Sequence, residues 1–172
     1  MKVIIMQGLP GAGKDRWIRR NLVNPRVCST DLFPGLYPEP GKIDASKLGQ
    51  AHAWCLRQFI EAINSPAGVR PVVVNNTNLG IAEIAPYIAV ARAFGIEPEV
   101  VRLHVTPELA AARNIHGVPL EVTLRMEATF ERTIIEWPPF WPKTVGGDRP
   151  CDQVKCEPAL ACDEPTTTTV EG

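Results

Sequence analysis

The feature that most constrains this chain is a glycine-rich stretch near its beginning, which reads Gly8-Leu9-Pro10-Gly11-Ala12-Gly13-Lys14-Asp15. An apolar, β-branched run at residues 2–7 precedes the stretch, and a helical pattern that extends to about Asn24 follows it. In such a strand–loop–helix, glycines let backbone N–H groups turn inward, while the helix N-terminus and the lysine add positive charge. The sequence therefore predicts a phosphate-binding loop of the Walker A type, with all eight residues around the phosphates of a nucleotide.

The rest of the chain alternates between strand-like and helix-like segments. Expected strands are 26–30, 71–75 and 99–105, and expected helices are 45–64, 81–94, 107–114 and 119–137. Such alternation with short links is typical of a parallel sheet with helices on both faces, whose ligands bind beyond the carboxyl ends of the strands. We therefore predict an α/β fold of the P-loop NTPase type, in which the last two helices form a lid.

Length and composition set the expected domain organisation. At roughly 150 residues per domain, 172 residues leave room for one domain, which we place at residues 1–142. Residues 143–172 are rich in Pro, Thr, Glu and Gly and have little to bury, so we expect a flexible, Pro/Thr-rich C-terminal tail. Two of the five cysteines, Cys28 and Cys55, lie in apolar segments, and free thiols are expected.

Charge and hydropathy exclude several classes of partner. Lys plus Arg number 18 and Asp plus Glu 19, so the net charge of −1 provides no global basic field to hold a long duplex. Any contact with nucleic acid must therefore be local. The chain shows no signal-peptide pattern and no stretch of roughly 20 apolar residues, so we expect a cytoplasmic protein that does not bind membranes.

Polar residues follow two of the expected strands, and each has two interpretations. Asp31 comes directly after the second strand, where a carboxylate can accept a proton from a hydroxyl group or can stabilise a turn. Residues 75–78, Asn-Asn-Thr-Asn, end the third strand and either face the same crevice or hold loop backbone.

Two further residues are candidates for a role at the phosphates. Asp15 stands where a Ser or Thr usually holds Mg²⁺, so it is either a metal ligand or a helix cap. Arg113 either extends from the lid over the phosphates or is an exposed helix residue.

Five segments together resemble a known family. They are GLPGAGKD at 8–15, STD at 29–31, NNTNL at 75–79, RNIHGVP at 113–119 and Leu124-Arg125-Met126. In order and spacing they resemble the kinase domain of bacteriophage polynucleotide kinase and its small P-loop relatives, over most of residues 1–137. The Walker A part is shared by many kinases, whereas the segments after the third strand and in the lid are more specific.

The resemblance implies a kinase domain that uses ATP and Mg²⁺. It assigns catalytic roles to Lys14 on the phosphates, to Asp31 as the base that activates the acceptor hydroxyl, and to Arg113 on the lid. It also marks a set of substrate or lid candidates: Asn76, Thr77, Asn78, His116 and Arg125. Asn76 and His116 stand where the family usually has an aspartate and a second basic residue. We expect Asp15 and Asn76 to compensate each other beside the metal ion.

The resemblance covers several acceptors. Members phosphorylate 5′-hydroxyl ends, or 5-hydroxymethyluracil in phage DNA during thymidine hypermodification, and the distant zeta toxins phosphorylate a nucleotide sugar. We expect an ATP-dependent kinase of DNA, in host cytoplasm if the chain is viral, with four arginines (16, 19, 20 and 26) as a local phosphate-binding face or a solvated helix face. The alternatives are a kinase of a small nucleotide-like metabolite and, because three positions depart from the pattern, a catalytically silent nucleotide-binding module.

Overall fold

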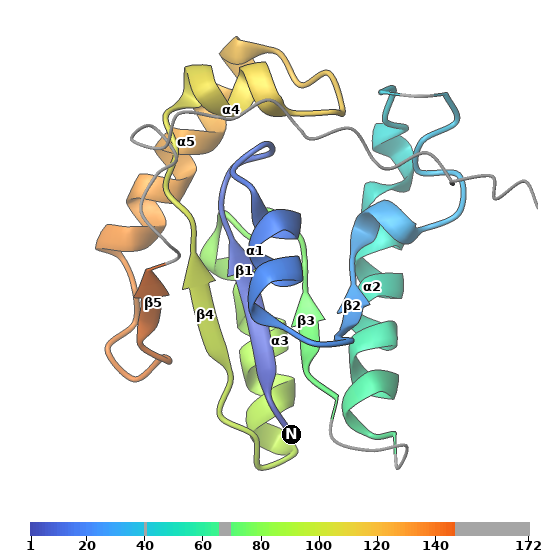
Figure 1. Cartoon of the computed structure of the whole chain (residues 1–172), viewed down its shortest axis with the longest axis vertical. Helices are drawn as coiled ribbons and strands as arrows, with labels where there is room; N and C mark the ends of the chain where they lie inside the picture. The colour runs from blue at the N-terminus through green and yellow to red at the C-terminus, as the bar shows by residue number, and fades with distance from the viewer. Residues whose placement is uncertain (40, 66–69, 147–172) are drawn as a thin grey trace, which may run out of the picture.

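The computed structural model describes residues 1–39, 41–65 and 70–146 and contains one five-stranded parallel sheet (Figure 1). The strands are β1 (Val3–Gln7), β2 (Arg26–Cys28), β3 (Val72–Val74), β4 (Glu99–Arg102) and β5 (Thr144–Gly146). Their order across the sheet is β2-β3-β1-β4-β5, and every pairing is parallel. Because β1 lies between β3 and β4, the loop that follows β1 lies at the centre of the sheet edge where ligands bind.

Helices cover both faces of the sheet, as expected. They are α1 (Lys14–Asn21), α2 (Leu48–Ile63), α3 (Ile81–Ala93), α4 (Pro107–Arg113) and α5 (Leu120–Ile135). Figure 1 shows α1 in front of the sheet and α3 behind it, with α4 and α5 beyond the carboxyl ends of the strands. The P-loop NTPase-type α/β fold predicted from the sequence is confirmed.

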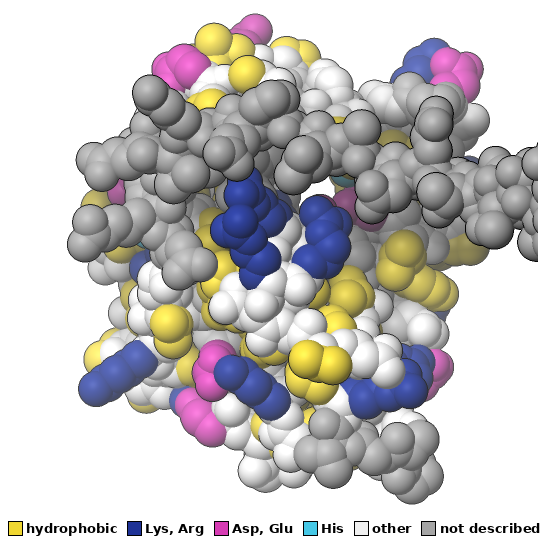
Figure 2. Space-filling model, viewed as in Figure 1, with side chains coloured by type: hydrophobic (Ala, Val, Ile, Leu, Met, Phe, Trp, Pro, Cys, Tyr) yellow, Lys and Arg dark blue, Asp and Glu magenta, His cyan; other side chains and the backbone are white. Residues whose placement is uncertain are grey.

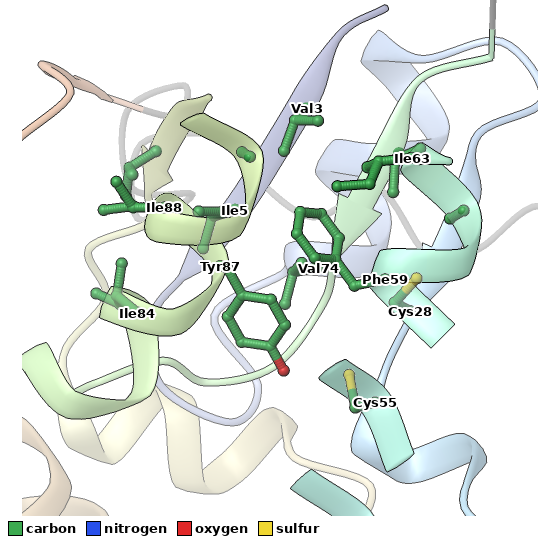
Figure 3. Close-up of a cluster of buried hydrophobic side chains, with 14 residues drawn as sticks. Val3, Ile5, Cys28, Cys55, Phe59, Ile63, Val74, Ile84, Tyr87 and Ile88 are labelled. Atoms are coloured by element: carbon green, nitrogen blue, oxygen red, sulfur yellow. The ribbon is translucent and has the colours of Figure 1, made fainter. Parts of the chain in front are cut away.

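Alternation of side chains along β1 explains why both faces are buried. Val3 and Ile5 join a core with α2 and α3, whereas Ile4 and Met6 join a second core under α1. All four are at most 1% exposed. Figure 3 shows the first core, in which the rings of Phe59 and Tyr87 approach one another between α2 and α3, with centroids 5.3 Å apart.

The lid rests on the phosphate loop through a third, smaller core. Leu9 of the loop packs with Leu79, Ala110 of α4 and Phe130 of α5, and all four side chains are buried. The sequence predicted both lid helices within two residues of their observed ends. The lid core therefore joins the loop, the segment after β3 and the two lid helices into one body.

Several predicted boundaries were wrong. The strands expected at 26–30 and 99–105 end at Cys28 and Arg102, and the helix expected to extend to about Asn24 ends at Asn21. After β2 the chain enters the 3-10 turn at Thr30–Leu32, and after α1 the backbone becomes extended at Leu22. The sheet also continues beyond residue 142, since β5 pairs with β4 through Val145 opposite Val101. Residues 147–172, the remainder of the expected tail, lie outside the described residues. Among the described residues, no helix is long and apolar enough to cross a membrane.

Candidate active site

The glycine-rich loop connects β1 to α1 as the motif requires. The backbone N–H of Gly8 donates to the Thr77 carbonyl oxygen at 2.9 Å, and the N–H of Ala12 donates to the Leu9 carbonyl at 3.1 Å. Gly13 caps α1 with φ of +90°, a left-handed conformation that strains any residue with a side chain. The loop therefore has the strand–loop–helix context that makes the Walker A assignment specific.

Two of the glycines allow the loop to approach other backbone closely. A Cβ at Gly8 would lie 2.8 Å from the Leu103 carbonyl oxygen, just after β4. A Cβ at Gly11 would collide with the Ala110 carbonyl oxygen and lie 3.0 Å from the Asn114 nitrogen, at the end of α4. A larger residue at either position would push the loop away from the sheet or from the lid.

Lys14 curls back over this loop. Its Nζ donates to the carbonyl oxygens of Gly8 at 3.0 Å and Leu9 at 2.9 Å. Burial lowers the pKa of Lys14 to about 8, and the carboxylates of Asp15 and Asp31 oppose that shift. The phosphate-loop ammonium therefore lies within the electrostatic reach of both carboxylates that the sequence singled out.

Asp15 pairs with a residue that the sequence analysis did not single out from its neighbours. Asn75 Nδ2 donates to Asp15 Oδ1 at 2.7 Å, which orients the carboxylate at the start of α1. The expected partner of Asp15, Asn76, is buried and points away into the core. The backbone bends at Asn76, directly after Asn75, and the two adjacent side chains lie in different surroundings.

Asn76 and Asn78 make hydrogen bonds inside the protein. Asn76 Oδ1 accepts from Thr30 N at 2.8 Å and from Thr30 Oγ1 at 3.1 Å. Fully buried Asn78 donates from Nδ2 to the Met6 carbonyl at 2.7 Å. The structure thus gives both amides a role in holding the ends of neighbouring strands, in place of the expected contacts with substrate. The Thr77 carbonyl oxygen accepts the hydrogen bond from Gly8 N–H of the phosphate loop.

Asp31 lies in a short 3-10 turn, Thr30–Leu32, that directly follows β2. Ser29 caps the turn by accepting from the Asp31 N–H at 3.2 Å, so the cap role falls to the serine and the Asp31 side chain remains available. The Tyr37 hydroxyl donates to Asp31 Oδ1 at 2.8 Å. Ser29 was quoted only within the segment STD at 29–31, without the role of a cap, and Tyr37 was not singled out because the loop at 33–41 lacks periodicity.

The turn between α4 and α5 is organised by Asn114. Its Oδ1 accepts from the N–H groups of His116 at 3.1 Å and Val118 at 2.9 Å. This turn places His116 Nε2 at 3.8 Å from Asp31 Oδ2. The structure therefore brings together Asp31 and His116, which lie 85 positions apart in the sequence.

The two lid arginines occupy different places. Arg113 is the exposed last residue of α4, one residue before Asn114. Arg125 is exposed on α5 and lies 3.7 Å from Glu121, one helical turn earlier. Such a surface pair contributes little to stability, so the contact leaves Arg125 able to exchange partners.

Comparison with known proteins identifies the family of this fold and site. The sequence profile of the AAA domain matches residues 3–133. The chain belongs to the AAA domain family. NEDD4-binding protein 2 of Homo sapiens is 31% identical in an alignment of 143 residues that covers 77% of this chain. The chain spans only 8% of the length of that relative.

Solved structures agree with the fold of this AAA domain. A gluconokinase from Sinorhizobium meliloti 1021 matches with a TM-score of 0.53 at 17% identity, over 87% of this chain and 84% of that chain. A proposed kinase from Chloroflexus aurantiacus j-10-fl matches with a TM-score of 0.58 at 16% identity, over 90% and 91% of the two chains. These similarities show a P-loop kinase-like fold.

The residues of this AAA domain fit a nucleoside triphosphate and Mg²⁺. Glycine at positions 8 and 11 keeps the loop compact, and Lys14 supplies positive charge. Asp15 supplies the carboxylate oxygens that Mg²⁺ prefers. Within the described residues, no three His, Cys, Asp or Glu side chains form a metal-binding group. One carboxylate is nevertheless enough for Mg²⁺, which usually takes its remaining ligands from phosphates and water.

Proposed function

We propose that this chain is an ATP-dependent kinase that transfers the γ-phosphate to a hydroxyl group. One observation carries the proposal: the carboxylate of Asp31, after β2, and Lys14 of the phosphate loop, after β1, lie at the same carboxyl edge of the parallel sheet. A phosphate-binding cation and a candidate base at one edge of the sheet are what phosphoryl transfer to a hydroxyl requires.

Each residue has a defined task in this proposal. The N–H groups of the loop and the start of α1 bind the phosphates, and Lys14 neutralises their charge. Asp15, oriented by Asn75, holds Mg²⁺, which would supply further charge neutralisation at the phosphates. Asp31 takes the proton of the acceptor hydroxyl, and Arg113 stabilises the phosphoryl group from the lid.

For the acceptor we propose a hydroxyl on DNA: the hydroxymethyl group of 5-hydroxymethyluracil in phage DNA, or a 5′-hydroxyl end. The sequence resemblance to polynucleotide kinases supports this choice. So does the exposure of three arginines on α1, at positions 16, 19 and 20, since Lys and Arg side chains gather over that helix (Figure 2). These side chains can bind backbone phosphates locally, as a net charge of −1 requires.

The direct test is incubation with γ-labelled ATP, Mg²⁺ and a panel of acceptors. The panel contains 5′-hydroxyl oligonucleotides, DNA with 5-hydroxymethyluracil, free nucleosides and nucleotide sugars. We expect label in one of the DNA acceptors. Label in a nucleoside or sugar would favour the small-metabolite alternative, and label in none would leave a silent nucleotide-binding module.

Variants connect the activity to the site. Lys14→Ala should abolish transfer, whereas Lys2→Ala, which removes a surface pair with Glu99 at the opposite edge of the sheet, should not. Asp31→Asn should lower kcat by about 100-fold or more with nearly unchanged ATP affinity. Arg113→Lys keeps the charge but loses the planar guanidinium, so its rate should fall sharply.

A further inference from the structure

Two side chains from segments distant in the sequence meet beside the Asp31 carboxylate. Tyr37 comes from the loop after β2, and His116 comes from the turn between the lid helices. The two rings stack with centroids 4.9 Å apart and planes inclined by 21°. The backbones of the two segments also lie close together: a Cβ built on Gly117 would be in van der Waals contact with the Gly41 carbonyl oxygen, at 3.7 Å. The lid turn therefore packs directly against the loop after β2.

The two oxygens of Asp31 have different surroundings. Oδ1 accepts the hydrogen bond from the Tyr37 hydroxyl. Burial, together with this carboxylate, raises the pKa of Tyr37, so the phenol remains a donor across the physiological range. Oδ2 faces His116 Nε2 at 3.8 Å, which is too long for a direct hydrogen bond.

The spacing of Oδ2 and Nε2 allows one hydroxyl oxygen to make a hydrogen bond with each of them. An oxygen at a hydrogen-bond distance of about 2.8 Å from each atom spans 3.8 Å with an angle of roughly 85° at the oxygen. Both flanking side chains can be reached from solvent, since Asp31 is 48% and His116 33% exposed. A ligand hydroxyl can therefore approach from the solvent side and contact both atoms at once, with its oxygen to one side of the line that joins them.

We propose that Asp31 Oδ2 and His116 Nε2 together hold the acceptor hydroxyl, which donates to Oδ2 and accepts from Nε2–H. This inference rests on the proposed kinase function and specifies its acceptor site. The sequence resemblance places His116 at a position that contacts phosphate, whereas the geometry places it against the general base. Tyr37 acts through the other two residues, as a positioning residue that fixes Oδ1 and the imidazole plane.

In the proposed step, one phosphoryl group passes from ATP to the acceptor oxygen and one proton passes from that oxygen to Asp31. The acceptor oxygen gives its proton to Asp31 Oδ2 and uses a lone pair to form the bond to the γ-phosphorus of ATP. The bond from that phosphorus to the β-bridging oxygen breaks, and its electron pair leaves with ADP. His116 keeps its proton throughout, because its task is to direct the acceptor oxygen. Asp31 then returns its proton to water.

The test uses the full chain, labelled ATP, and a duplex with 5-hydroxymethyluracil or whichever member of the acceptor panel takes up the label. His116→Phe keeps a ring to stack on Tyr37 but removes the donor, and His116→Gln restores an N–H. Tyr37→Phe is the matched control, since it keeps the stack and the imidazole. We measure kcat/KM for the acceptor, ATP affinity by calorimetry, and Tm.

His116→Phe should lower kcat/KM for the acceptor by about tenfold or more, as expected for the loss of a hydrogen bond in the transition state. ATP affinity and Tm should remain near wild type, and His116→Gln should recover part of the loss. Tyr37→Phe should have a smaller effect than His116→Phe, because Oδ2 and Nε2 both remain.

The experiment distinguishes failure of the proposed kinase function from failure of the proposed acceptor site. If the wild-type chain labels no acceptor, the proposed function is refuted and the inference with it. If transfer occurs but His116→Phe matches wild type, only the inference is overturned. Weaker ATP binding in His116→Phe with an unchanged acceptor KM would assign His116 to the phosphates, and a loss in Tyr37→Phe as large as that in His116→Phe would assign the effect to the orientation of Asp31 alone. Either result contradicts the proposed site.

Discussion

Substitution of Gly11 by alanine tests how tightly the phosphate loop is held against the lid. Gly11 has φ of +83°, and an added Cβ would meet the backbone of Ala110 and Asn114 instead of a flexible side chain. Neither backbone group can move without shifting the end of α4. Gly11→Ala should therefore destabilise the fold through backbone strain and through overpacking at the same time.

The two contributions can be estimated separately. A residue with a Cβ in a left-handed conformation costs roughly 1–2 kcal/mol, and an overpacked contact costs about 1–3 kcal/mol. Gly11→Ala should thus lower the free energy of unfolding by about 2–5 kcal/mol, if the terms add. For a chain of this size, each kcal/mol corresponds to a fall in Tm of roughly 2–4 °C.

Two other glycines provide matched controls. Gly13 has φ of +90° but nothing within 4 Å of its added Cβ, so Gly13→Ala should show only the strain, about 1–2 kcal/mol. Gly49 lies in α2 without a positive φ or a nearby atom, so Gly49→Ala should stabilise the chain by up to about 1 kcal/mol.

The assay is urea unfolding without nucleotide, monitored by far-UV circular dichroism. The wild type and the three glycine variants are compared at equal concentration. The free energy of unfolding should fall in the order Gly49→Ala, wild type, Gly13→Ala, Gly11→Ala. Equal losses in Gly11→Ala and Gly13→Ala would show that the loop does not press on α4, and would refute the reasoning.

Further predictions concern the interior and the edge of the site. Asn76→Ala leaves the buried Thr30 N–H without its acceptor and should lower the free energy of unfolding by about 1–3 kcal/mol in urea titration; a loss near zero would contradict the assigned role. In double-mutant cycles on Mg²⁺-dependent turnover, Asp15→Ala should be non-additive with Asn75→Ala, which shares its hydrogen bond; simple addition would show that the contact has no bearing on the metal. Burial raises the pKa of the Cys28 thiol to about 12, so between pH 7 and 9 it stays protonated and should resist iodoacetamide until urea unfolds the chain; peptide mass spectrometry measures this, and native alkylation at the unfolded rate would contradict it.

The sequence alone determined the local architecture around the phosphates. Glycine, lysine and the flanking apolar run restrict residues 2–21 to a strand, a loop and a helix, because the required backbone angles and periodicities are properties of consecutive residues. The alternation of strands and helices likewise predicted the parallel sheet and the lid. Asp31 was found because the carboxyl ends of parallel strands meet at one edge.

Tertiary structure decided which side chains face each other across that edge. Asn75 rather than Asn76 reaches Asp15 because the chain bends after β3 and Asn76 is packed in the core. Tyr37 and His116 stack beside Asp31 because the lid turn packs on a loop without periodicity. β5 belongs to the sheet although its three residues carry no strand pattern, since its hydrogen bonds are made to β4 and depend on that neighbour. Local propensity fixes backbone conformation, but the partners of a side chain depend on packing between segments distant in sequence, and a spacing pattern does not encode that packing.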